Sequence, residues 1–299
     1  MSGSLYVFLA AVGFSFKSIL IKLAYVHPVD AATLLTLRMA FSLPFFLAMA
    51  LWSGRSRRHA MLDRRQWGAV LSLGFIGYYL AAYLDFLGLQ HISASFERLT
   101  LFLYPTLVVL LSALLLKRRI TRVEALALLL SYAGIVLVFA ENLSFGEKEH
   151  EVWLGAGLVF VSALLYSFYL IGSAEVVGKI GPLRFTAYAM TVACLFTFLQ
   201  FLLTHPLSAF VLPHQVYTLT FVMALTSTVV PSWLMSEGLR RIGANQAALV
   251  GSIGPVVTIL LGYVFLDEPV TKLQLAGAAL VLGGVTLVTM RRATHDRLA

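Results

Sequence analysis

Two stretches of this chain align without a gap at an offset of 150 residues (238 minus 88). The first is GLQHISASFERLTLFLYPTLVVLLSALLLKRRITRVEALALLLSYAGIVLV, from Gly88 to Val138, and the second is GLRRIGANQAALVGSIGPVVTILLGYVFLDEPVTKLQLAGAALVLGGVTLV, from Gly238 to Val288. Identical pairs are Gly88/Gly238, Leu89/Leu239, Ile92/Ile242, Ala94/Ala244, Leu99/Leu249, Pro105/Pro255, Leu116/Leu266, Thr121/Thr271 and Gly134/Gly284. A duplicated apolar chain is typical of carriers whose two halves move about a site between them.

The duplication continues towards the N-terminus, where the alignment drifts by a few residues. There, Val7-Phe8 corresponds to Val159-Phe160, Ser15-Phe16 to Ser167-Phe168, and Pro28 to Pro182. We therefore divide the chain into a first repeat at 1–142, an acidic linker at 143–149, a second repeat at 150–292 and a tail at 293–299.

The composition is that of an integral membrane protein. Hydrophobic residues make up 60% of the 299 residues and charged residues 12%, and the mean hydropathy is +0.88. Soluble domains have about 45–50% apolar and about 25% charged residues. Ten apolar segments have the length of about 20 residues that a membrane-spanning helix needs. They lie near 5–25, 31–53, 67–90, 94–116, 122–140, 153–174, 183–204, 216–239, 244–266 and 272–290.

Five spans per repeat is an odd number, so the two repeats enter the membrane from opposite sides. The sequence thus predicts an all-α fold of ten transmembrane helices in two inverted five-helix repeats around a central cavity.

Basic residues alternate between the loops. One set of loops carries Arg55, Arg57, Arg58, Arg64, Arg65, Lys117, Arg118, Arg119, Arg122, Lys179, Arg184, Arg240, Arg241, Arg291, Arg292 and Arg297. The other set carries only Arg98, Lys148 and Lys272. The positive-inside rule places the first set and both termini in the cytoplasm, and we expect a bacterial inner membrane as the location. The net charge of +8 is then explained by loops that face an anionic leaflet, without a nucleic-acid partner.

No pattern of an enzyme is present in the sequence. The chain has no Gly-rich phosphate loop, zinc-binding HExxH helix or GxSxG turn, and its loops are too short to form a separate catalytic domain. We expect no enzymatic activity, no cofactor and no metal.

Four charged residues inside the spans are candidates for substrate binding, because an ionisable group at membrane depth is costly and tends to face a cavity or a partner. They are Lys17, Arg38, Asp85 and Glu97. The alternative for Lys17 is a side chain that extends to the interface, and Arg38 is equally suited to a lipid headgroup. The alternative for Asp85 and Glu97 is an ion pair at a helix end, such as Glu97 with Arg98.

Aromatic and hydroxyl side chains near the middle of spans are further candidates for the cavity wall. They are Tyr78, Tyr83, Tyr166, Trp233 and Ser236. Tyrosine and tryptophan also form belts at the membrane interface, which is the alternative for each. A phenol or indole in the middle of the bilayer would lack a hydrogen-bond partner in lipid, which favours the cavity.

Pro105 and Pro255 occupy equivalent positions in the fourth and ninth spans, and Gly251 and Gly254 precede the second proline. A proline inside a helix removes one backbone hydrogen bond, so matched prolines predict paired hinges beside the path of the solute. Close helix packing through small residues is the alternative for the glycines.

Several of these motifs resemble the EamA repeat of the drug/metabolite transporter superfamily. They are Gly88 to Ser95 with Pro105 in the first half, and Leu266 to Thr271 with Gln274, Gly277 and Gly284 in the second. The second half has the acidic turn Asp267-Glu268 of this repeat, whereas the first half has the basic residues Lys117-Arg118-Arg119 in its place. The resemblance implies a central cavity lined by helices 1 to 4 and 6 to 9, with helices 5 and 10 peripheral. Within the superfamily, amino-acid exporters of the YddG type are the expected relatives.

We therefore predict an alternating-access exporter of small metabolites, with aromatic or neutral amino acids first among them. Lys17 or Arg38 would bind the carboxylate, Asp85 or Glu97 the ammonium group, and the aromatic candidates the side chain. The alternatives are a carrier of phosphorylated or other organic solutes or drugs and, less favoured, a passive channel. The expected partners are the solute and the lipid bilayer.

Overall fold

The computed structural model describes residues 2–54, 62–115, 117, 119–144 and 149–295. The basic positions Arg55, Arg57, Arg58, Arg118, Lys148 and Arg297, and most of the predicted linker and tail, lie outside this range. The described residues include helices and no strand. Ten of their helical segments are long and apolar enough to cross a membrane. The predicted all-α, ten-span fold is confirmed.

The first half contributes five spans, and two of them are built from more than one helix. Its elements are α1 (Gly3–Tyr25), α2 (Ala31–Gly54), α3 (Arg64–Leu73), η1 (Gly74–Leu80), α4 (Ala81–Gly88), α5 (Ala94–Leu101), α6 (Tyr104–Leu115) and α7 (Arg122–Ser144). The third span consists of α3, η1 and α4 in series, and the fourth consists of α5 and α6.

The second half repeats this plan. Its elements are α8 (Glu149–Ile180), α9 (Pro182–Thr204), η2 (Leu207–Phe210), α10 (His214–Ala224), η3 (Leu225–Val229), α11 (Val230–Gly251), α12 (Gly254–Leu266) and α13 (Lys272–His295). The eighth span ends within α11 at Gly243, where φ is 75° and ψ is 167°. Glycine adopts this backbone conformation without the steric cost that a side chain would add.

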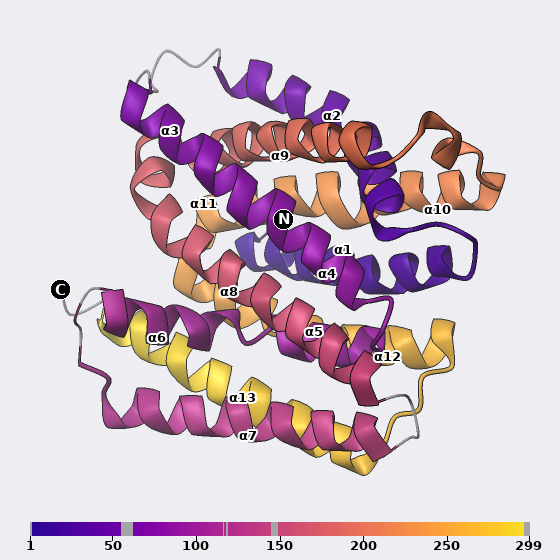
Figure 1. The fold of residues 1–299 in the computed structure, drawn as a ribbon. Helices are drawn as coiled ribbons and strands as arrows, with labels where there is room; N and C mark the ends of the chain where they lie inside the picture. Colours follow the sequence, from indigo (N-terminus) through magenta and orange to yellow (C-terminus); the bar gives the residue numbers. More distant parts are fainter. Residues whose placement is uncertain (1, 55–61, 116, 118, 145–148, 296–299) are drawn as a thin grey trace.

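The helices pack in pairs that combine the two halves. Figure 1 shows α7 and α13 side by side along one edge of the bundle, and α2 beside α9 towards the opposite edge. Between them, α1 packs on α11 and α12, and α4 and α5 pack on α8. Buried apolar side chains such as Ile21, Leu34 and Phe86 fill one core cluster, and Phe96, Leu103 and Val281 belong to another.

Equivalent glycines let one half approach the other closely. A Cβ built on Gly88 of α4 would lie 2.5 Å from Cγ2 of Val159 on α8. A Cβ on Gly238 of α11 would lie 2.5 Å from Cγ2 of Val7 on α1. Both pairs are related by the duplication, so the same packing occurs twice and a larger residue at either glycine would push the helices apart.

The third and eighth spans each contain a stretch of wider π-helical turns, at η1 and η3. Adding 150 to the bounds of η1 gives 224–230, which includes all of η3. In η1 the amide of Ala81 donates to the carbonyl of Ile76, and in η3 the amide of Val230 donates to that of Leu225. Such turns are frequent at functional sites, because they alter the direction of the side chains that follow.

A hydrogen-bonded cap fixes the start of α2. Oδ1 of Asp30 accepts hydrogen bonds from the amides of Ala32 and Thr33 at 2.8 and 3.0 Å, and lies 3.4 Å from Nε2 of His205. Partial burial opposes the ionisation of Asp30, but the hydrogen bonds from Thr33 and Ala32 and the nearby His205 outweigh it and hold the pKa of Asp30 below its ordinary value. The α2 cap thereby connects to the loop that follows α9.

Candidate functional site

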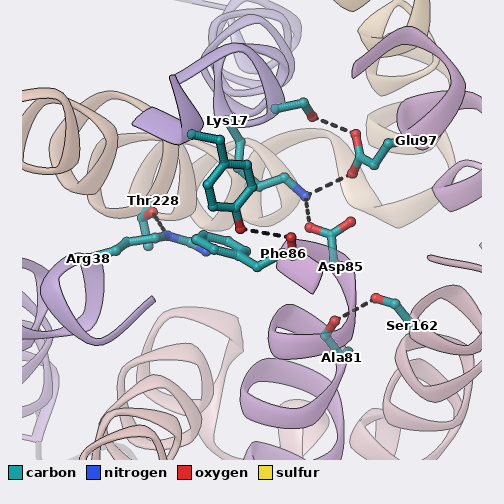
Figure 2. Close-up of polar contacts among 10 residues, drawn as sticks. Lys17, Arg38, Ala81, Asp85, Phe86, Glu97, Ser162 and Thr228 are labelled. Carbon is teal, nitrogen blue, oxygen red and sulfur yellow. Dashed lines mark hydrogen bonds and ion pairs between the residues drawn. The ribbon is translucent and has the colours of Figure 1, made fainter. Parts of the chain in front are cut away.

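Three of the predicted site residues meet inside the bundle (Figure 2). Nζ of Lys17 on α1 lies 2.6 Å from Oδ2 of Asp85 on α4 and 3.1 Å from Oε1 of Glu97 on α5. The side chains of these residues are 13%, 4% and 0% exposed. Lys17 therefore points into the bundle, and both carboxylates pair with it and not with a residue of their own helix. We call the three residues the ion cluster.

Hydrogen-bond donors are divided unevenly between the two carboxylates. Oγ of Ser18 donates to Oε2 of Glu97 at 2.5 Å, so both oxygens of Glu97 accept a hydrogen bond. Asp85 accepts only from Lys17, and its Oδ1 is buried without a partner among the described residues. The ion cluster thus contains one unsatisfied acceptor, at Asp85.

Arg38 lies beside the ion cluster and is buried, so it does not reach lipid headgroups. Its Nε donates to Oγ1 of Thr228 at 2.8 Å, and its guanidinium carbon lies 5.4 Å from the ring centre of Phe86 (Figure 2). Tyr25 donates to the carbonyl of the same Phe86 at 2.8 Å. These contacts hold the residue next to Asp85 from two sides and place a cation over an aromatic ring.

Four tyrosines form a continuous aromatic group between the two halves. The hydroxyl of Tyr169 donates to that of Tyr78 at 3.1 Å, and Tyr166 stacks on Tyr169 with ring centres 5.4 Å apart. Tyr104 meets Tyr166 edge to face at 5.3 Å. Tyr78 and Tyr166 are predicted site residues, Tyr169 lies on the same predicted polar face as Tyr166, and Tyr104 joins them only in the structure.

Among the candidates for the site, Arg98 enters the sequence analysis only in the alternative for Glu97, as its partner in an ion pair at a helix end. The structure separates the two side chains, and no ion pair joins them in the described part of the chain. A Cβ built on Gly254 would lie only 2.7 Å from Nη2 of Arg98, so the absence of a side chain at Gly254 makes room for the guanidinium group. Nε of Arg98 is buried and has no hydrogen-bond partner within the described residues.

The remaining predicted residues are placed away from the ion cluster or only flank it. Trp233 on α11 is 36% exposed and its ring meets that of Tyr6 at 6.0 Å, and Ser236 donates to the carbonyl of Ser232 on its own helix. Tyr83 is half-buried two residues before Asp85 and packs against the core cluster of α1 and α2. The structure thus brings together Lys17, Asp85 and Glu97 directly, with Arg38 beside them.

The acidic turn after α12 holds the start of α5. Glu268 accepts hydrogen bonds from the amide of Ala94 at 2.6 Å and from the amide and hydroxyl of Ser95 at 3.1 and 2.6 Å. A carboxylate at a helix N-terminus is stabilised by the free amides and the helix dipole. Because α5 carries both Glu97 and Arg98, this turn of the second half positions charged side chains that the first half supplies.

The fourth and ninth spans are each interrupted directly before the equivalent prolines. α5 ends at Leu101 and α6 begins at Tyr104, next to Pro105; α11 ends at Gly251 and α12 begins at Gly254, next to Pro255. The predicted hinge residues therefore lie at the ends of helices and not in the middle of bent ones.

One serine from the opposite half contacts each interruption. Oγ of Ser15 on α1 lies 3.0 Å from the carbonyl oxygen of Gly254, and Oγ of Ser167 on α8 lies 3.1 Å from that of Tyr104. Each hydroxyl shares its one proton with a carbonyl of its own helix, that of Ala11 at 2.8 Å or of Ala163 at 2.7 Å. Both the serines and their acceptors are equivalent by the duplication. Each interruption is thus attached to the first helix of the other repeat.

Replacing these serines tests the two contacts. We expect Ser15→Ala and Ser167→Ala each to lower the free energy of unfolding by about 1 kcal/mol, because each removes one buried hydrogen bond between helices. The double variant should lose about the sum, since the sites lie in separate interfaces. Reversible unfolding in detergent measures the effect. Ser72→Ala is the control, since its exposed hydroxyl bonds only within α3, and an equal loss in this control would contradict the assignment.

Known proteins share the sequence pattern of this chain over nearly its whole length. The sequence pattern described as the EamA-like transporter family matches residues 1–140 and 153–290. The chain belongs to the EamA-like transporter family. This EamA protein is a membrane transporter, and the resemblance seen in its sequence motifs is confirmed.

Relatives and a solved structure share nearly the full length of this EamA chain. The "Uncharacterized transporter YcbK" of Bacillus subtilis is 32% identical over 300 residues, covering 96% of this chain and 91% of its own. An "Uncharacterized transporter" of Archaeoglobus fulgidus is 25% identical, covering 94% and 95%. One crystal structure superimposes with a TM-score of 0.68 at 20% identity, covering 97% of this chain and 96% of the other, which shows a shared fold.

Proposed function

We propose that this EamA transporter exports small metabolites that carry both charges, foremost aromatic and neutral amino acids, by alternating access. The observation that carries the proposal is a pair of buried, unsatisfied atoms of opposite character: the acceptor Oδ1 of Asp85 and the donor Nε of Arg98. A buried polar atom without a partner is unfavourable, and a ligand with complementary groups removes that penalty. A zwitterion offers an ammonium group for the first atom and a carboxylate for the second.

The carboxylate of the solute is assigned to Arg98. Lys17 is already bound by two carboxylates, and Nε of Arg38 is bound to Thr228. Arg98 lies at the interruption of the ninth span, beside Gly254, where both halves meet. A guanidinium group binds a carboxylate through a planar fork of donors, which makes arginine well suited to this role.

The apolar part of the solute is assigned to the tyrosine group. The charge of Arg98 acts on the hydroxyl groups of Tyr104 and Tyr166, which supports placing these rings near a solute bound at Arg98. Aromatic rings bind other rings and aliphatic groups at low entropic cost. This arrangement favours amino acids with aromatic or neutral side chains.

The structure also bears on two alternative functions, a carrier of phosphorylated solutes and a passive channel. A phosphorylated solute without an ammonium group offers no donor of that kind to Oδ1 of Asp85, so it would leave this buried acceptor unsatisfied. A passive channel needs a continuous polar lining, whereas the interrupted fourth and ninth spans give two equivalent points of bending, as a carrier with inverted repeats requires.

The orientation in the membrane belongs to the same proposal. The loops rich in lysine and arginine connect spans at the end of the bundle where the chain begins, which supports cytoplasmic termini by the positive-inside rule. Relatives in Bacillus subtilis and Archaeoglobus fulgidus support a location in the membrane that bounds a prokaryotic cell.

Counterflow in proteoliposomes tests the proposed function. Vesicles loaded with unlabelled tryptophan or leucine should accumulate the labelled amino acid transiently and with saturation, and a sugar phosphate should not exchange. Accumulation of the sugar phosphate without exchange of amino acids would refute the solute class. Flux that does not saturate would refute alternating access.

A further inference from the structure

The ion cluster places two carboxylates in contact with one ammonium group, and all three side chains are largely buried. If all three side chains were ionised, the contacting groups would carry a net charge of −1. Asp85 and Glu97 are 4% and 0% exposed, and an uncompensated charge at such a position is costly. A proton bound by one carboxyl would neutralise the ion cluster.

The geometry distinguishes the two carboxylates. Glu97 accepts from Lys17 and from Ser18, so each of its oxygens has a donor. Asp85 has the unsatisfied Oδ1, although its Oδ2 lies closest to Lys17. Hydrogen bonds to an ionised carboxylate stabilise the charged form, and Glu97 receives more of them. Asp85 is therefore the residue that takes up a proton.

Other ionisable groups around Asp85 leave this assignment unchanged. Those whose charge acts on Asp85 or Glu97 include Lys17 and Tyr25 on α1, Arg38 on α2, and Glu97 and Arg98 on α5. Arg38 and Arg98 are the two further cations. Neither forms an ion pair with Asp85 or Glu97 in the described part of the chain, because Arg38 bonds to Thr228 and Arg98 lies against Gly254.

We propose that Oδ1 of Asp85 binds one exchangeable proton, and that this proton is the ion coupled to transport; the coupling rests on the proposed function. The step forms one O–H bond at Oδ1 with a proton released by a hydronium ion of the aqueous phase, which becomes water. Release reverses the step into the aqueous phase on the other side.

Protonation changes which helices the ion cluster connects. When Asp85 is neutral, Glu97 is the one carboxylate of the ion cluster that still carries a negative charge beside Lys17. The ion pair between α1 and α4 is then lost, while the ion pair between α1 and α5 remains. α5 ends four residues after Glu97, at the interruption before Pro105. Oδ1 of Asp85 cannot bind the ammonium group of a substrate while it carries a proton. The proton and the amino acid therefore exclude each other from the site and must cross the membrane in opposite directions.

Infrared difference spectroscopy of the full chain in proteoliposomes tests the proton site without any substrate. Acidification of the wild type should produce the carbonyl stretch of a protonated carboxyl that shifts in D₂O, and Asp85→Asn should lack this band. Asp30→Asn is the matched control, because Asp30 is a partly exposed carboxyl outside the spans, and the buried-carboxyl band should persist. A band of unchanged intensity in Asp85→Asn would overturn the assignment.

The coupling is tested by a pH indicator trapped inside vesicles that contain the wild-type protein. Tryptophan added outside should make the interior more alkaline, with the same saturation as counterflow, and a protonophore should abolish the change. Tryptophan counterflow with a constant internal pH would overturn the coupling and leave the proposed function standing. An Asp85-dependent infrared band without counterflow of any amino acid would leave the proton site standing and refute the proposed solute. The wild-type measurement needs no variant, so it remains decisive if Asp85→Asn fails to fold.

Discussion

Lys17→Met is expected to lower the free energy of unfolding by about 3–5 kcal/mol, the loss that follows when one partner of a buried ion pair is removed. The substitution keeps a long apolar side chain on α1 but leaves Asp85 and Glu97 facing each other without their shared cation. Two carboxylates in one buried site repel each other, and the interior offers little solvent to screen them. Counterflow should be lost together with stability.

Unfolding in detergent at several pH values measures this effect. The loss should shrink as the pH falls, because protons can replace the missing ammonium group and neutralise the carboxylates. Lys272→Met is the matched control: Lys272 is exposed at the start of α13, so the change should be within about 0.5 kcal/mol. The double variant Lys17→Met/Asp85→Asn should recover part of the stability. A single variant as stable as the wild type would show that Lys17 is not the counter-ion of the ion cluster.

The sequence predicts the fold because both its main signals are local or repeated. Apolar segments of membrane length give the ten spans, and the gapless repeat places Pro105 and Pro255 at equivalent points, where the structure has helix interruptions. Their role as hinges stays a prediction. The wider turns of η1 and η3 are not predictable in this way. These turns depend on which backbone carbonyl accepts the hydrogen bond of each amide, and the hydropathy of the sequence does not determine that partner.

The sequence predicts individual residues of the site but not the contacts between them. Lys17, Asp85 and Glu97 stand out because each places a charge at membrane depth, but their mutual contact joins residues 68 and 80 positions apart, and only tertiary packing determines it. Position near the middle of a span also selects Trp233, but the structure places this residue on a partly exposed face of its helix. Position along a span does not tell which side of the helix faces lipid. Tyr104 carries no signal of its own before the fold is known.

Arg98 is a residue that the sequence analysis did not select for the site, although a signal was present. Adjacent residues on a helix point about 100° apart, so Glu97 and Arg98 cannot face each other across one helix surface. In the structure, Glu97 reaches Lys17 on α1 while Arg98 reaches Gly254 on α12. Helix geometry alone therefore argued against the helix-end pair and favoured two separate partners.

Arg98→Gln is expected to weaken the binding of amino acids by about 30-fold or more, because removing one partner of a buried, hydrogen-bonded charge pair costs about 2–5 kcal/mol, and 1.4 kcal/mol corresponds to a tenfold change. The fold should persist, since Arg98 forms no ion pair in the described part of the chain. Inhibition of tryptophan counterflow by unlabelled tryptophan and by its decarboxylated analogue, tryptamine, measures the effect.

The two inhibitors separate a role in carboxylate binding from a structural role. Arg98→Gln should raise the concentration of tryptophan needed for half inhibition and leave that of tryptamine nearly unchanged, because tryptamine lacks the group that Arg98 binds. Arg98→Lys should recover only part of the difference, since an ammonium group cannot form the planar two-point contact. Arg65→Gln, at an exposed arginine of α3, is the matched control and should alter neither value. An equal change for both inhibitors would mean that Arg98 acts through packing at the Gly254 interruption, and the carboxylate site would then have to lie elsewhere.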